Sequence, residues 1–433
     1  MGIFKKAFSL TVITALLLSV LSLTGCKDKN LFGKTTLRCA YWGDVKEVEI
    51  INNSVKRFKE KNPGIDVKLE KLPAGDPYTE KMLTQIAGGN PPDVMFINAE
   101  RFIIFAAKDI FLPLDDYIAK DKFPLENYYS EIVDKYSLNG KVYALPRDIA
   151  PVCVVYFNRN LFESAGVKFP DNNWTWNDLL DKAKKLTIKN SDGTTTYGFA
   201  DDWPIWEAWV LSNGAKYVDD IKNPKKCLLD SKEALDGIRF RQNLVHKYKV
   251  APSPANMSAM GGVGASDLFM QGKAAMFFSG IWKAPFFREI TAFKWDAVMF
   301  PKNNSGKRGF NLSGAGYAAL KTTKHPEESW KLITFLSGED GQRELAETGL
   351  AQPAIKNIAN SPAFLDGKPP AGKKFLLDAV QYGTFEPDMT AWQEAKSKFL
   401  YPALDKVWNG DNKPEEVIPA AVAEINKDYF NIK

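Results

Sequence analysis

The chain has 433 residues, of which 45% are hydrophobic and 12% aromatic, and its formal net charge is +5. A chain of this length can bury a large core, and two lobes are the natural expectation. The small net charge and the lack of basic runs with interleaved aromatic residues argue against a nucleic-acid-binding protein. Only two histidines occur, and the cysteines have no metal-ligand spacing, so we expect neither a metal site nor a cofactor.

The first 25 residues have the layout of a signal peptide, with Lys5 and Lys6 before an uncharged apolar stretch at 7–23. That stretch is shorter and more polar than a membrane-spanning helix of about 20 apolar residues. Its Leu-Thr-Gly-Cys ending resembles the lipobox of bacterial lipoproteins. The resemblance implies cleavage before Cys26, lipid on that thiol, a tether over 26–35, and anchoring at the extracellular face of a single-membrane bacterium. An uncleaved anchor helix and an ordinary signal peptide are the alternatives.

Three further cysteines, Cys39, Cys153 and Cys227, allow at most one disulfide, and their spacing selects none. Cys39 and Cys153 lie in apolar, strand-like runs, which predicts buried thiols.

The segment that follows the tether predicts alternating strands and helices. Strands are expected at 36–41, 65–69 and 94–97, and helices at 45–61 and 78–87, the first capped by Asp44. This order favours a parallel sheet covered by helices, in which ligands bind outside the carboxyl ends of the strands. The residues at those ends are 41–44 and 98–101.

The rest of the chain predicts further strands and helices in mixed order. Thr175 is expected to cap a helix that runs to Leu186, with Asp178 completing a capping box. Residues 310–320, which contain Gly314 and Gly316, predict one continuous strand. The other expected strands are 142–146, 151–157, 197–200 and 274–278, and the other expected helices are 231–248, 267–271, 326–336, 339–348, 397–408 and 415–430.

Five motifs in order resemble the extracellular sugar-binding proteins of bacterial ABC importers, the family that includes maltose-binding protein. They cover nearly the whole chain after the signal peptide, and they lie at 145–151 (LPRDIAP), 156–162 (YFNRNLF), 163–176 (from ESAGV to NWTW), 278–282 (FSGIW) and 349–354 (GLAQPA).

The resemblance implies an α/β, type II periplasmic-binding-protein fold with two discontinuous lobes, a hinge and a ligand cleft between the lobes. Lobe one would comprise 36–148 plus 310–352, and lobe two 149–309 plus 353–433. The expected function is a monomeric binding protein, not an enzyme, that closes on a carbohydrate and delivers it to membrane permease subunits.

The candidate ligand contacts combine charged groups for sugar hydroxyls with flat aromatic rings for sugar faces. The resemblance supplies the Glu100–Arg101 pair and Trp282. Each candidate also has an interpretation without a ligand. The tryptophans could pack in the core, Glu100 and Arg101 could form a surface ion pair, and Asp148 could pair with Arg147 in the hinge. The full set is Trp42, Glu100, Arg101, Asp148, Trp203, Trp206, Trp282, Gly316, Gln352 and Trp392.

Two other functions compete with sugar binding. A secreted glycoside hydrolase needs two carboxylates about 5–10 Å apart, and Asp148 and Glu100 could supply them, although no catalytic motif supports this. The same fold could also bind a peptide, a polyamine or an iron complex, but the tryptophan-rich mixture with Arg101 and Asp148 favours sugar.

Overall fold

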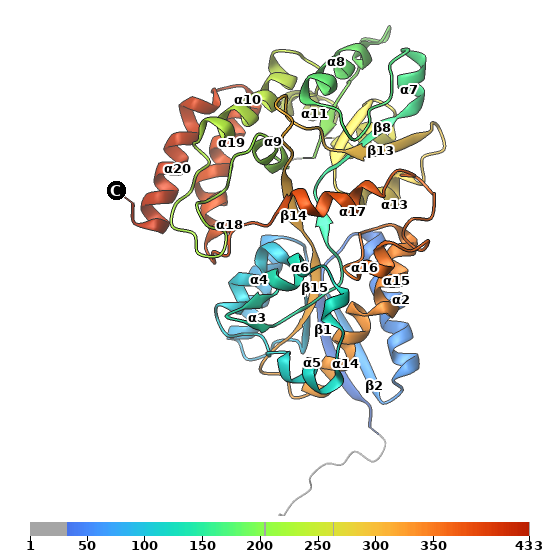
Figure 1. The fold of residues 1–433 in the computed structure, drawn as a ribbon, viewed down its shortest axis with the longest axis vertical. Coiled ribbons are helices and arrows are strands. Elements are labelled where there is room, and N and C mark those ends of the chain that lie inside the picture. The colour runs from blue at the N-terminus through green and yellow to red at the C-terminus, as the bar shows by residue number, and fades with distance from the viewer. Residues whose placement is uncertain (1–32, 203–204, 263, 433) are drawn as a thin grey trace, which may run out of the picture.

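The computed structural model describes residues 33–202, 205–262 and 264–432, and it has two α/β lobes joined by crossing strands (Figure 1). The lower lobe in the figure contains β1, β2 and α2, and the upper lobe contains β8, β13 and the C-terminal helices. The two-lobed α/β fold expected from the sequence is confirmed. The signal peptide, Cys26 and Trp203 lie outside the described residues.

Lobe one is built on a five-stranded sheet in the order β2-β1-β3-β15-β6. The first three of these strands are parallel, as predicted, and β15 runs antiparallel to both β3 and β6. Asp44 caps the first helix by accepting from the amides of Lys46 and Glu47. The strands are β1 (Thr35–Tyr41), β2 (Ile65–Lys71), β3 (Val94–Asn98), β6 (Leu145–Pro146) and β15 (Ala315–Ala319).

The helices of lobe one come from both ends of the chain. Helix α2 contacts α14 and α15, so residues about 280 positions apart in sequence lie together. The helices of lobe one are α2 (Val45–Lys61), α3 (Asp76–Ala87), α4 (Ala99–Ala106), α5 (Asp115–Asp121), η1 (Leu125–Asn127), α6 (Ser130–Lys135), α14 (Pro326–Ser337), α15 (Glu339–Thr348) and α16 (Lys356–Ala359). The lobe also contains a hairpin of β4 (Ser137–Leu138) and β5 (Lys141–Val142).

Lobe two is built on a four-stranded sheet in the order β11-β12-β8-β13. Thr175 and Asp178 form the predicted capping box at the start of α8. The strands are β8 (Val154–Asn158), β11 (Ala200–Asp201), β12 (Met276–Ser279) and β13 (Trp295–Met299), with a separate pair of β9 (Ile188–Lys189) and β10 (Thr195–Thr196).

The helices of lobe two flank this sheet and form an additional C-terminal bundle, in which α19 and α20 pack on α10. They are α7 (Arg159–Ser164), α8 (Trp176–Leu186), α9 (Glu207–Ser212), α10 (Lys232–His246), α11 (Pro254–Ala259), α12 (Ala265–Met270), η2 (Ile281–Lys283), α13 (Ala284–Phe287), α17 (Phe375–Ala379), η3 (Val380–Tyr382), α18 (Trp392–Ala395), the π-helix η4 (Lys396–Leu400), α19 (Tyr401–Asn409) and α20 (Pro414–Phe430).

The lobes are connected by a small sheet in the order β16-β14-β7, formed by β7 (Ala150–Pro151), β14 (Phe310–Ser313) and β16 (Gly383–Thr384). The prediction of one continuous strand over 310–320 is wrong. Gly314 has a φ of 157° and separates β14, in the hinge, from β15, in lobe one. Its closest neighbour is the backbone oxygen of Asp148, only 2.6 Å from where a Cβ would lie, so a side chain would clash.

The segment that follows Gln352 continues to pack on lobe one before the chain crosses to lobe two. Asp148 and Pro353 form an isolated bridge, and the amide of Ile355 donates to the Gln342 side chain at 2.8 Å. Helix α16 therefore packs on α15, although the predicted lobe two resumes at residue 353.

The three described cysteines are free and fully buried, in separate parts of the molecule. Cys39 lies in β1, Cys153 next to the hinge and Cys227 in the core of the C-terminal bundle. Burial raises the pKa of Cys39 and of Cys227 to about 12, and it raises the pKa of Cys153 further. Among the described residues, none of the helices is long and apolar enough to cross a membrane.

Candidate ligand site between the lobes

The lobe-one wall of the candidate site begins at Trp42, which directly follows β1. Its half-buried ring stacks on Phe96 with centroids 4.3 Å apart and meets Tyr78 edge-on at 5.0 Å. The Tyr78 hydroxyl donates to the carbonyl of Phe96 at 2.8 Å. Because its neighbours are fixed, Trp42 presents a preorganised aromatic surface at the carboxyl end of the sheet.

Glu100 and Arg101 lie at the start of α4, one strand further along the same edge. The Glu100 carboxyl is buried and contacts the Ser313 hydroxyl of the hinge, and burial raises its pKa. Its Oε2 has no hydrogen-bond partner among the described residues. Arg101 donates from Nη2 to Asp76 Oδ1 at 2.8 Å.

The lobe-two wall is formed by the carboxyl ends of β11 and β12. The Ser279 hydroxyl donates to Asp202 Oδ2 at 2.7 Å, and the Lys283 Nζ lies 3.5 Å from the same oxygen. Burial raises the pKa of Asp202, although Lys283 opposes this shift. Ser279 pairs with Val154, next to the hinge, so this end of the sheet faces lobe one.

Trp282 of η2 connects the two lobes directly. Its half-buried ring packs on a small cluster of lobe-one residues that includes Ile50, Leu345 and Leu350. Lys46 of lobe one also pairs with Glu289 of lobe two at 3.2 Å. The two walls are therefore brought together on this side of the molecule.

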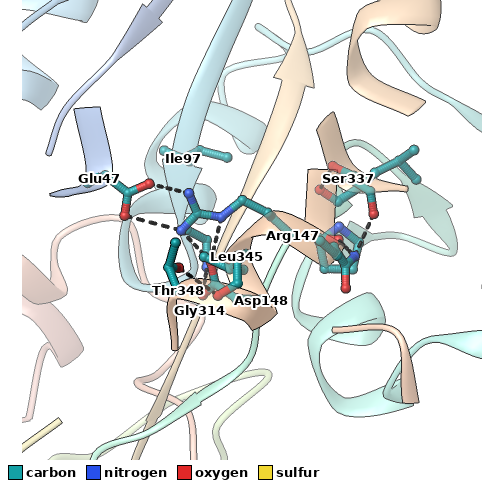
Figure 2. A network of polar contacts seen from close by, with 12 residues as sticks. Glu47, Ile97, Arg147, Asp148, Gly314, Ser337, Leu345 and Thr348 are labelled. Atoms are coloured by element: carbon teal, nitrogen blue, oxygen red, sulfur yellow. Dashed lines mark hydrogen bonds and ion pairs between the residues drawn. The ribbon is translucent and has the colours of Figure 1, made fainter. Parts of the chain in front are cut away.

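Asp148 lies in the hinge and belongs to a buried network with Arg147 and Glu47, which Figure 2 shows. Arg147 donates to Asp148 Oδ2 from Nε at 2.8 Å and from Nη2 at 2.6 Å, and it forms an ion pair with Glu47. Asp148 Oδ1 accepts from the amide of Ala315 at 3.0 Å. Burial alone would lower the pKa of Arg147, but the charges of Glu47 and Asp148 raise it well above its usual value.

A second buried network, here called the glutamate cluster, contains Glu100, Glu207, Glu386 and Lys396. Glu386 forms an ion pair with Lys396 and accepts from Gln393 Nε2 at 2.6 Å. Burial raises the pKa of Glu207 to about 8, with a further rise from the charges of Glu386 and Glu100 and an opposing effect of Lys396. Glu207 and Glu386 of lobe two thus interact with the ammonium group of Lys396, and both also interact with the carboxyl group of Glu100 of lobe one.

Four of the predicted ligand contacts lie inside the packed interior. Trp206 and Trp392 are each only 1% exposed, and both rings contact Tyr217 with centroids 6.1 Å apart. Gln352 is fully buried, and a Cβ on Gly316 would lie 2.5 Å from the carbonyl oxygen of Leu145. The Nε1 atoms of Trp206 and Trp392 are nevertheless buried without a hydrogen-bond partner among the described residues.

The structure thus groups Trp42, Glu100 and Arg101 on one wall, with Trp282 on the facing wall. It places Asp148 in the hinge. There Asp148 forms the ion pair with Arg147 that was the alternative to ligand contact. Contact with a ligand stays a prediction for every residue of the set, including Trp203, which lies outside the described residues.

The candidate contacts chosen from the sequence do not include Asp202, Ser279, Lys283, Glu207 and Glu386. The position of Asp202 directly after β11 could have identified it by the same rule that identified Glu100. Glu386 follows the two-residue strand β16, and no periodic pattern marks it.

No group of three or more His, Cys, Asp or Glu side chains in the described part of the chain is arranged to hold a metal ion.

Comparison with known proteins identifies the family. Residues 42–343 match the family described as bacterial extracellular solute-binding protein. A binding protein of Brucella abortus (strain 2308) is 26% identical over 385 residues, which cover 85% of this chain and 87% of the relative. The galactooligosaccharide-binding protein of Bacillus subtilis (strain 168) is 24% identical over 405 residues, covering 90% and 89%.

A solved structure is similar over nearly its whole length. The ABC substrate-binding protein from Listeria monocytogenes in complex with cycloalternan superposes with a TM-score of 0.82 at 28% identity, covering 91% of this chain and 98% of that one. The family match spans well over half of the sequence, and the two-lobed fold agrees with it. The chain therefore belongs to the bacterial extracellular solute-binding protein family.

Proposed function

We propose that this chain is the carbohydrate-binding component of an ABC importer, which captures an oligosaccharide between its lobes and delivers it to membrane permease subunits. The observation that carries the proposal is the composition of the two facing walls. Each wall has a tryptophan and a carboxylate, Trp42 with Glu100 and Trp282 with Asp202.

These side chains suit a sugar because a pyranose ring has both an apolar face and a rim of hydroxyls. Indole rings bury the apolar face with little loss of side-chain entropy, and charged groups make the stronger hydrogen bonds to the hydroxyls. Relatives named for galactooligosaccharide and for maltodextrin, and the structure with cycloalternan, support an oligosaccharide ligand.

The competing hydrolase is less well supported by the contacts of its two candidate carboxylates. Both oxygens of Asp148 accept hydrogen bonds, from Arg147 and from the Ala315 amide. Because both oxygens already have hydrogen-bond partners, Asp148 has no free oxygen to offer to a glycosidic bond.

A lipid anchor would keep such a receptor beside its importer. We propose that the signal peptide is cleaved before Cys26 and that lipid on this thiol holds the protein at the outer face of the membrane. The tether is short, because β1 of lobe one begins at Thr35. Anchoring and sugar binding would then reside in different parts of the chain.

Binding is tested on a purified chain that begins at residue 27, with thermal unfolding and isothermal titration against maltose, galactobiose, mannobiose and their longer homologues. A ligand that binds only the folded state raises the unfolding temperature, by an amount equivalent to about 2.7 kcal/mol at a hundred times its Kd. No shift with any sugar would contradict the proposal.

The variant Trp282→Ala is expected to reduce the binding free energy of the tightest of these ligands by about 2 kcal/mol or more, as is usual for a central aromatic contact. Trp282→Phe keeps a flat ring and is the matched control. Chromatography after long incubation with bound sugar tests hydrolysis, and the appearance of shorter products would favour the enzyme instead.

Anchoring is tested with Cys26→Ala in the full-length chain. We expect the variant to be found in the culture medium or as uncleaved precursor, with sugar binding unchanged. A variant that stays at the cell surface with its signal peptide removed would contradict lipid attachment at Cys26.

A further inference from the structure

A cavity of about 410 Å³ lies in lobe two and shares Asp202 with the lobe-two wall described above. It is formed between the C-terminal part of α10, the helices α11 and α12, and α19, and its lining includes Asp202, Arg241, Met257, Ala265, Asp405 and Trp408. This volume falls in the range of small-molecule sites, roughly 300–1,000 Å³.

The polar side of the cavity is rigid. Arg241 forms a bidentate ion pair with Asp201, with both nitrogen–oxygen distances at 2.9 Å, and its guanidinium lies 4.1 Å from the ring centroid of Trp408. Gln242 of the same helix donates to the carbonyls of Val407 at 2.9 Å and Asn412 at 2.7 Å. Because α10 and α19 are fixed to each other, little order is lost when a ligand binds.

The lining combines groups that suit a sugar ring. Met257, Pro252 and Pro254 contribute apolar surface, and Asp405 contributes an exposed carboxylate. Trp408 belongs to the lining, but it is only 4% exposed beneath Arg241. The ion pair with Asp201 uses Nε and Nη2 of Arg241, so the guanidinium has further N–H groups for hydroxyl oxygens.

The cavity and the lobe-two wall share one residue. Asp202 lines the cavity, and its carboxylate also accepts from Ser279 and pairs with Lys283 on the lobe-two wall. The cavity is therefore adjacent to the proposed site between the lobes.

We propose that this cavity is a distal subsite for an additional sugar ring, so that the ligand is an oligosaccharide longer than a disaccharide. The inference rests on the proposed function and deepens it, since it names the class of ligand by length.

The test compares ligand series that differ only in length, from maltose to maltohexaose, galactobiose to galactotetraose and mannobiose to mannotetraose, by isothermal titration. For the series that binds, we expect Kd to fall at least about tenfold when the chain becomes long enough to enter the cavity. The variant Ala265→Trp fills the cavity from α12 and is expected to abolish this gain, while disaccharide binding changes less than about twofold.

Ala259→Trp adds the same side chain on α11, outside the lining, and is the matched control. Asp405→Ala changes only an exposed side chain, so it tests the cavity even when Ala265→Trp does not fold. We expect it to reduce the affinity gained with the longer sugar about threefold or more.

The outcomes separate the two proposals. Binding that is independent of length, or a gain that both Ala265→Trp and Asp405→Ala leave intact, would overturn the subsite but leave sugar binding in place. A wild-type protein that binds none of the three series would overturn the proposed function and the subsite with it.

Discussion

The two buried polar networks of this molecule differ in how completely their charges are matched. In the hinge network, Arg147 satisfies both Glu47 and Asp148, and the remaining Asp148 oxygen accepts from a backbone amide. In the glutamate cluster, Glu207 and Glu386 share Lys396, and Glu100 adds a third carboxyl group whose Oε2 has no hydrogen-bond partner among the described residues.

This difference separates a structural network from one suited to a ligand. A buried charge that is fully partnered holds its neighbours in one arrangement, whereas a buried carboxyl with an unused oxygen retains a desolvation cost that a ligand hydroxyl can offset. We therefore expect the hinge network to determine stability and the glutamate cluster to respond to pH and to ligand.

The largest effect is expected from Arg147→Met. Removal of the guanidinium leaves Glu47 and Asp148 buried without their partner, which should lower the free energy of unfolding by about 3–5 kcal/mol. Urea denaturation at pH 7 measures this loss. The triple variant Glu47→Gln, Arg147→Met, Asp148→Asn removes every charge of the network and should lose less; a greater loss in the triple variant would contradict the interpretation.

A pH dependence of intermediate size is expected from Glu207. Its folded-state pKa of about 8 lies above its ordinary value of 4.5, so the folded protein binds more protons than the unfolded chain between these pH values. The free energy of unfolding should therefore fall as the pH rises through this window, by at most about 1.4 kcal/mol per pH unit.

Glu207→Gln should flatten this dependence by roughly 2 kcal/mol between pH 5 and 8, measured by urea denaturation at several pH values. Glu60→Gln changes an exposed glutamate and is the control. Equal pH profiles for the wild type and Glu207→Gln would mean that Glu207 does not titrate in this window.

The smallest effect on folding is expected from Glu100→Gln. Burial already disfavours the charged carboxylate, so stability should change by less than about 1 kcal/mol, while the best oligosaccharide of the panel should bind about tenfold more weakly. Isothermal titration and urea denaturation of the same preparation measure both, with the exposed Glu126→Gln as control. A loss of stability as large as that of Arg147→Met would remove the distinction between the two networks.

The sequence was sufficient for features that depend on neighbouring residues. Helix caps at Asp44 and Thr175 and the parallel start of lobe one follow from short patterns, and the structure confirms them. The rule that ligands lie beyond the carboxyl ends of strands also identified Trp42 and Glu100, which lie at the same edge of the sheet.

Features that depend on distant residues could not be predicted in the same way. Residues 310–320 alternate like one strand, and only the close approach of the Asp148 backbone to Gly314 explains the break between the two sheets. Glu47 is 100 positions from Arg147, and Glu207 is far in sequence from Glu386 and Lys396. Burial also decided the environments of Trp206 and Trp392, because a tryptophan in a core and one in a site have similar sequence surroundings.

The three buried thiols have a practical consequence. Alkylating reagents react with the thiolate form, and the raised pKa values of Cys39, Cys153 and Cys227 keep these groups protonated and shielded from solvent. A chain that begins after Cys26 should therefore resist maleimide while it is folded. A single cysteine introduced at an exposed position near the meeting point of the lobes could then carry a fluorescent dye without further mutation, which would convert the protein into an optical reporter of its own ligand.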